Sequence, residues 1–297
     1  MDTQTMHTAL PRASGASPPA REHAGLRAAR VMSAMILPLM VAASAAGLRM
    51  GGLYQDPAGV NAMLRAYDLV TLVVVVPALA VVLLPSMRRS RCAQLLWLSA
   101  LAYAVYNYAI YVFGSAFNDM FLVHVALFSL SVFALALALA NLDVVTIAAG
   151  FRAGTPVRSV GVLLLLPAIG LGAMWGFYSL RFAFTGAAPG ESLLVLPSAS
   201  VHLGYVLDLA LLVPGYATAA VLLWRRAPWG YVLATVMAVF GTVYQLSYLT
   251  ALLFQASAKV PGATSFDPAE PFIAGVFAVA AALLLSGLRS ASRKGYG

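Results

Sequence analysis

The sequence predicts an all-α integral membrane protein with eight transmembrane helices. Of its 297 residues, 62% are hydrophobic and only 9% are charged, whereas soluble domains average about 25% charged residues. Its apolar runs approach or exceed the ~20 residues that a helix needs to cross about 30 Å of hydrocarbon. Helices are expected because lipid offers no partners for unpaired backbone groups, and barrel strands would be shorter and alternating.

The first part of the chain differs from the rest. Residues 1–26 are rich in Pro, Ala and Ser and have no hydrophobic period, so we expect a disordered cytoplasmic tail. Eight apolar segments follow, at about 31–50, 68–87, 93–113, 120–141, 159–182, 201–224, 229–254 and 271–288. The first segment and its Ala43-Ser44-Ala45 also match a cleaved signal peptide, which would leave seven helices. We favour a retained helix because a signal peptide begins close to the N-terminus.

The basic residues alternate between the two ends of the predicted helices. Fourteen of the 18 Lys and Arg residues fall in the two terminal segments and in every second connection, and four fall on the other side. This bias predicts that the helices cross the cell (inner) membrane and that both termini lie in the cytoplasm. The 16 arginines against 2 lysines indicate a GC-rich bacterial genome. The basic connections are expected to attract anionic lipids at the cytoplasmic face, by about 1 kcal/mol per charge.

The net charge of +8 does not indicate a nucleic-acid partner. Nucleic-acid-binding surfaces carry a stripe of basic residues interleaved with exposed aromatic residues. In this chain the basic residues lie at the ends of apolar runs and form no such stripe.

Two parts of the chain resemble each other. The second segment contains a block that opens at Asp68-Leu69, and the sixth contains a similar block that opens at Asp208-Leu209. In both, the first arginine of an Arg-Arg pair stands eleven positions after a proline, which is Pro77 in one block and Pro214 in the other. Four helices per copy is an even number, so both copies would point the same way through the membrane. The sequence therefore predicts two parallel four-helix units, residues 27–157 and 158–297.

Polar side chains gather in the outer halves of the predicted helices. At 100° per residue, Tyr106 and Asn107 share one face of the third segment, and Tyr244 and Gln245 share one face of the seventh. Asp208 lies seventeen residues before Arg225, or about 25 Å along a helix. That places its carboxylate just inside the outer boundary, where Arg181 and Tyr244 are candidate partners. The predicted cavity lining is Tyr106, Asn107, His124, Arg181, Asp208, Tyr244 and Gln245.

These residues also have structural explanations. Tyrosines near a membrane boundary can form an aromatic belt. Asn107 and Gln245 are typical of interhelical hydrogen bonds that hold a bundle together. Asp68 is expected to cap the start of its helix.

No cofactor, metal site or catalytic residue is predicted. Cys92 is the only cysteine, so an intrachain disulfide is excluded. His124 and His202 have no partners at ligand spacing for a metal or haem. The chain has no Gly-Lys-Ser/Thr phosphate loop, no His-Glu-x-x-His and no Gly-x-Ser-x-Gly, which favours a non-enzymatic function.

Three functions stay open. The first is a transporter or channel for a small molecule of unknown identity, with an outward-facing polar cavity. The second is an intramembrane enzyme that acts on a lipid or isoprenoid, with Asp208 or His124 as acid or base and Tyr244 as a hydrogen-bond donor. The third is a membrane sensor or assembly partner that binds through its tail. The parallel duplication and the equivalent polar faces favour transport.

Overall fold

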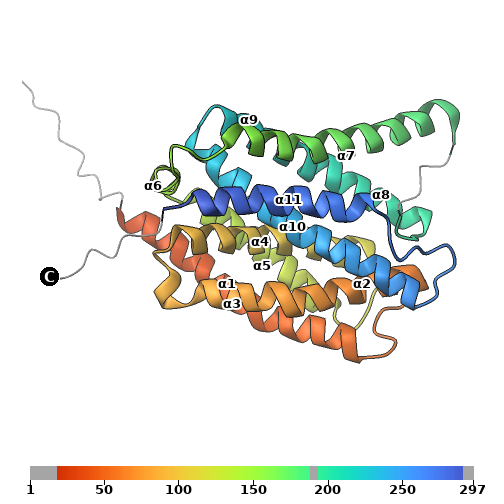
Figure 1. Ribbon diagram of the computed structural model, residues 1–297. Coiled ribbons are helices and arrows are strands. Elements are labelled where there is room, and N and C mark those ends of the chain that lie inside the picture. The colour runs from red at the N-terminus through yellow and green to blue at the C-terminus, as the bar shows by residue number, and fades with distance from the viewer. Residues whose placement is uncertain (1–18, 188–192, 290–297) are drawn as a thin grey trace, which may run out of the picture.

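The computed structural model describes residues 19–187 and 193–289, which form a bundle of helices lying roughly along one axis (Figure 1). Within these residues, eight helical spans are long and apolar enough to cross a membrane. The prediction of a helical, multi-pass membrane protein is confirmed. The shortest span, Ala269–Gly287, has 19 residues and is therefore about 28 Å long at 1.5 Å per residue, close to the thickness of the hydrocarbon core.

The helices follow one another along the chain with short connections. The first half contains α1 (Pro19–Arg49), α2 (Ala58–Val70), α3 (Val76–Leu83), α4 (Arg91–Gly114), α5 (Phe121–Ala140) and the short α6 (Val144–Ala148). The second half contains α7 (Val157–Thr185), α8 (Ser198–Leu207), α9 (Val213–Trp224), α10 (Pro228–Ser257) and α11 (Ala269–Gly287). Helices α2 and α3 together make the second span, and α8 and α9 make the sixth.

Two boundaries differ from those expected. Helix α1 begins at Pro19, inside the segment predicted as a tail, and residues 1–18 lie outside the described residues. The second span begins at Ala58, ten residues before Asp68. Hydropathy missed this first part because it is amphipathic, with Arg65 on the exposed side and Leu64 fully buried. Asp68 therefore lies inside its helix and does not cap it.

The arginine-rich connections meet at one end of the bundle, which we call the basic end. There the Arg30 guanidinium donates to the carbonyl oxygen of Arg88 at 3.3 Å, and the Arg152 N–H donates to the carbonyl oxygen of Gly287 at 2.9 Å. The start of α1 and the end of α11 also lie at this end (Figure 1). The opposite end, called the distal end, carries the connections after α1, α4, α7 and α10.

Helices α4 and α10 form the centre of the bundle and pack against each other. Around α4 lie α3 and α5, and α1 packs against both. Around α10 lie α9 and α11, and α7 packs against both. Contacts of α2 with α10 and of α4 with α8 join the two groups.

The second and sixth spans each contain a π-helical turn. These turns are Thr71–Val75 and Asp208–Leu212, and each is followed closely by a proline, Pro77 or Pro214. A proline inside a helix lacks an N–H and its ring clashes with the carbonyl group four residues earlier, which here lies in the π-helical turn. The wider turn accommodates this clash. In the sixth span it also changes the direction in which the Asp208 side chain projects from the helix.

Candidate functional site

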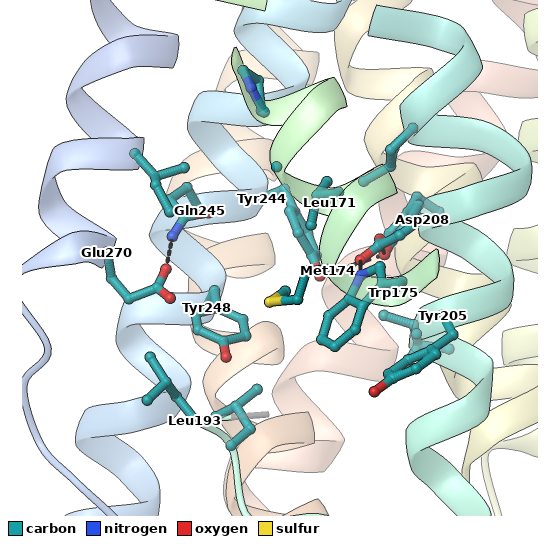
Figure 2. A pocket seen from close by; sticks show the side chains of 18 of the residues that line it. Leu171, Met174, Trp175, Leu193, Tyr205, Asp208, Tyr244, Gln245, Tyr248 and Glu270 are labelled. Carbon is teal, nitrogen blue, oxygen red and sulfur yellow. Dashed lines mark hydrogen bonds between the residues drawn. The ribbon is translucent and has the colours of Figure 1, made fainter. Parts of the chain in front are cut away.

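A cavity of about 650 Å³ lies in the distal half of the bundle. Its walls come from α2, α4, α7, α8, α9, α10 and α11, and from residues 193–196 between α7 and α8 (Figure 2). Most of its lining is apolar, including Met63, Leu171, Leu203, Ile273 and Phe277. The sequence predicted a polar cavity, but the structure instead concentrates a few polar groups at separate points of an apolar wall.

Asp208 forms the first of these points. Its side chain is only 5% exposed, and its two carboxylate oxygens have different partners. The Tyr106 hydroxyl donates to Oδ1 at 2.7 Å, and the Trp175 Nε1–H donates to Oδ2 at 2.9 Å. An indole N–H can only donate, so this contact requires an acceptor oxygen at that place. The three side chains come from three different spans, and Asp208 is the first residue of the π-helical turn.

Aromatic rings extend this polar point along the wall. The hydroxyl oxygens of Tyr106 and Tyr244 are 3.4 Å apart, and their ring centroids are 4.9 Å apart in an edge-to-face arrangement. The Trp175 ring packs against Tyr205 with a centroid distance of 4.1 Å. Tyr216 also lines the cavity, and its buried hydroxyl has no hydrogen-bond partner among the described residues.

Glu270 forms the second polar point, near the start of α11. The Gln245 side-chain amide, from α10, donates a hydrogen bond to Glu270 Oε2. Figure 2 shows this pair on one wall and Asp208 with Trp175 on the opposite wall, with Met174 between them. The cavity therefore holds two carboxyl groups, each bonded to neutral side chains.

Gln255 holds the segment between α7 and α8 over the cavity. This fully buried side chain donates to the carbonyl oxygens of Gly59 at 2.8 Å and of Val195 at 3.1 Å, and it accepts from the Val195 N–H at 2.9 Å. These bonds tie α10, α2 and residues 193–196 together. Leu193, Leu194 and Leu196 are thereby positioned as part of the wall.

The cavity has a side facing outward from the bundle between α7 and α11. Leu166 and Met174 on α7 and Phe272 on α11 line the cavity and are 50%, 42% and 69% exposed. In a membrane-spanning bundle, apolar side chains exposed at this depth face acyl chains. This side of the cavity is therefore accessible to a lipid-soluble molecule.

Four of the seven predicted site residues line the cavity: Tyr106, Asp208, Tyr244 and Gln245. The other three are elsewhere. Asn107 is buried outside the lining, and its Nδ2 has no hydrogen-bond partner among the described residues. Arg181, which we expected to be a partner of Asp208, is instead exposed on α7. The hydrogen bonds to Asp208 come from Tyr106 and Trp175.

His124 belongs to a second buried polar cluster in the first half of the chain. Its ring lies 4.7 Å from that of Tyr111, and the Tyr111 hydroxyl donates to Asp68 Oδ1 at 3.0 Å. The Tyr54 hydroxyl donates to Asp68 Oδ2 at 2.6 Å. Burial and the neighbouring Asp68 carboxylate raise the pKa of Tyr54 above its usual range, so Tyr54 acts as a hydrogen-bond donor there.

Gly47 on α1 makes room for this second cluster. A Cβ atom at this position would lie 1.9 Å from Asp68 Oδ2. No side chain larger than hydrogen fits there without moving Asp68. The absence of a side chain thus allows α1 to approach the carboxylate closely.

Sequence reasoning missed Trp175, Glu270 and Gln255. Trp175 lies in the long fifth apolar segment, and Glu270 lies one residue before the predicted eighth segment. Gln255 stands one turn from the end of α10, where a polar residue is ordinary. No local pattern distinguishes these residues, since their roles come from neighbours on other spans.

Metal binding finds no support among the residues that the structure describes, where no group of three or more His, Cys, Asp or Glu side chains could hold an ion. The two carboxyl groups of the cavity stand on opposite walls and are bonded to neutral donors. Such an arrangement can bind and orient a ligand.

The comparisons with known proteins return no relative. No protein-family model matches the chain, and neither a curated protein nor a solved structure matches it. Function therefore has to be argued from the geometry of this cavity.

Proposed function

We propose that this protein is a transporter of small amphipathic molecules and that the cavity is its ligand site. It is built from two parallel four-helix units, residues 27–157 and 158–297, related by an axis along the membrane normal. Several transporter families use such parallel repeats, with the ligand bound between them.

The helix packing supports the two units. The pairs α1–α3, α3–α4, α4–α5 and α1–α5 of the first unit correspond to α7–α9, α9–α10, α10–α11 and α7–α11 of the second. The two π-helical turns begin at Thr71 and Asp208, each six residues before Pro77 or Pro214. In this register Asp208 corresponds to Thr71, and the two Asp-Leu pairs are not equivalent.

The charge distribution supports one orientation. The basic end would face the cytoplasm of a bacterial inner membrane, where its arginines would meet anionic lipids. The distal half, with the cavity, would then lie toward the outer leaflet. Both termini would be cytoplasmic.

The single observation that carries the proposal is the lining of the cavity. Ligand sites typically measure about 300–1,000 Å³ and combine apolar walls with a few placed polar groups. This cavity has that size, two polar points and an apolar side on which Met174 and Phe272 are exposed. An amphipathic molecule could enter from the outer leaflet with its apolar part toward lipid and its polar group toward Asp208 or Glu270.

The alternative functions have less support. The enzyme hypothesis places Asp208 or His124 beside Tyr244. His124 packs against Tyr108 and Tyr111 and is not part of the lining, and the Asp208 carboxylate accepts from Tyr106 and Trp175. The sensor hypothesis depends on the tail, of which residues 1–18 lie outside the described residues. Neither gains a specific observation.

The test is transport by purified protein in liposomes. A panel of cationic, anionic and neutral amphipathic dyes would be offered, and accumulation measured against protein-free liposomes. Leu171→Trp places a large ring in the cavity lining and should abolish uptake, whereas Ile169→Trp, at a position 64% exposed on the same helix and outside the lining, should not. Failure of every dye to accumulate, or equal uptake by the two variants, would contradict the proposal.

A further inference from the structure

We infer that the cavity selects amphipathic cations, meaning organic molecules with an apolar body and one positive charge. This inference concerns the ligand class of the same site and rests on the proposal that the cavity is a ligand site. It goes beyond that proposal because the apolar walls alone would accept ligands of either sign.

The charges of the lining have one sign. Asp208 and Glu270 line the cavity, and none of the described lining residues is Lys, Arg or His. Coulomb interactions are strong in surroundings of low polarity. An anionic ligand would face two carboxyl groups with no cation to offset them, whereas a cationic ligand would complement both.

The partners of the two carboxyl groups leave their charge available. Asp208 accepts from a phenol and an indole, and Glu270 accepts from an amide. These donors are neutral, so they orient each carboxylate without cancelling its charge. A carboxylate with one bonded donor per oxygen still has lone pairs for a ligand, since it can accept about four bonds.

Aromatic rings surround the same space. Trp175, Tyr205, Tyr106 and Tyr244 line the cavity and pack in pairs. The faces of such rings carry partial negative charge and attract organic cations, and aromatic cages bind quaternary ammonium groups in this way. The rings therefore favour the same ligand charge as the carboxyl groups.

One residue of the lining carries a buried hydroxyl that is unpaired among the described residues. Tyr216 is 1% exposed and lines the cavity, and its hydroxyl has no hydrogen-bond partner among the described residues. Leaving a buried hydroxyl unpaired costs about 1–3 kcal/mol.

The test uses two probes that share one apolar shape and differ in the sign of their charge, tetraphenylphosphonium and tetraphenylborate. Equilibrium binding to the purified full chain in detergent is measured for each. We expect tetraphenylphosphonium to bind at least about tenfold more tightly. Asp208→Asn and Glu270→Gln should each weaken its binding by about tenfold or more, because each removes one charge from an apolar environment.

Matched controls separate a charge effect from misfolding. Asp119→Asn removes an exposed carboxylate at the distal end outside the lining and should leave binding unchanged. Asp208→Glu keeps the charge and should restore part of the affinity lost in Asp208→Asn. If one of the two neutral variants fails to purify as a monodisperse species, the other carries the test.

Two results would overturn the inference: equal or tighter binding of tetraphenylborate, or unchanged phosphonium affinity in both neutral variants. Its failure is distinguishable from that of the transport proposal. Uptake of anionic or neutral dyes without cation preference would leave transport intact and reject cation selection. Selective phosphonium binding without uptake into liposomes would support cation selection and reject the transport proposal.

Discussion

The Trp175 indole nitrogen donates a hydrogen bond to Asp208 Oδ2 across 2.9 Å, and this contact joins α7 to the π-helical turn of the sixth span. Beyond Trp175, the distal part of α7 is mostly exposed. The bond is therefore a main attachment of this part of α7 to the rest of the bundle. It also fixes the orientation of the carboxylate that we assign to ligand binding.

Replacing Trp175 with Phe should weaken both the fold and the site. The change keeps an aromatic ring but removes the N–H, so one carboxylate oxygen loses its donor. Hydrogen bonds to charged groups contribute about 1.5–3 kcal/mol, and we expect Trp175→Phe to lower the unfolding temperature in detergent and the phosphonium affinity. Trp229→Phe, at an exposed site near the basic end, is the control. Equal behaviour of the two variants would show that the Trp175 bond is unimportant.

Replacing Gly47 with Ala should destabilise the first half of the bundle. The added methyl group would overlap Asp68 Oδ2 and force α1 or the carboxylate to move. Overpacking of this kind costs about 1–3 kcal/mol. Gly51→Ala adds the same methyl group where nothing lies within 4 Å, and it should leave the unfolding temperature unchanged. The prediction is wrong if Gly47→Ala unfolds at the wild-type temperature.

Replacing Gln255 with Leu should release the segment that covers the cavity. The substitution removes one hydrogen bond to the carbonyl oxygen of Gly59 and two to the half-buried backbone of Val195, each worth about 0.5–1.5 kcal/mol. Hydrogen exchange read by mass spectrometry should become faster at residues 193–196. Gln94→Leu, which removes one exposed bond at the basic end, is the comparison. Unchanged protection of Val195 would mean that the clamp is not what holds this segment.

Asp56 should make stability depend on pH in the opposite direction to a typical surface aspartate. Burial raises its pKa, an effect that the backbone hydrogen bonds from the Ala116 N–H only partly offset. The folded state then binds more protons than the unfolded state around this pKa, so the contribution of Asp56 is present at low pH and lost as pH rises through the folded pKa. Because the group is half-exposed, the effect should stay below about 1 kcal/mol.

The measurement compares wild type with Asp56→Asn, whose amide oxygen can still accept from Ala116 but does not titrate. From pH 3.5 to pH 7, on either side of the usual pKa of about 3.9, the unfolding temperature of Asp56→Asn should rise relative to wild type. Asp119→Asn, which removes an exposed carboxylate, should show no such rise. A relative fall for Asp56→Asn would contradict the sign of the pKa shift.

The sequence alone determined the class of protein and the number of spans. Apolar length and the rarity of charge require helices across a membrane, because only helices and closed barrels satisfy the backbone in lipid and barrel strands would be shorter and alternating. The arithmetic from Arg225 placed Asp208 inside the sixth span, and the helical period placed Tyr106 and Tyr244 on polar faces in the distal half. The depth of a residue in the membrane and the face on which it lies depend on the sequence of its own helix, so they can be predicted from that helix alone.

Only the tertiary structure decided which of these residues meet. Tyr106 and Asp208 are 102 positions apart in the chain, and their contact depends on how α4, α7 and the sixth span are rotated about their axes. The tertiary structure brings Trp175 to Asp208, where Arg181 was expected. It also places His124 in a different cluster and pairs Gln245 with Glu270. Hydropathy and periodicity describe depth and face along a single helix, whereas side-chain packing between helices sets their neighbours and rotation, and no local pattern contains that information.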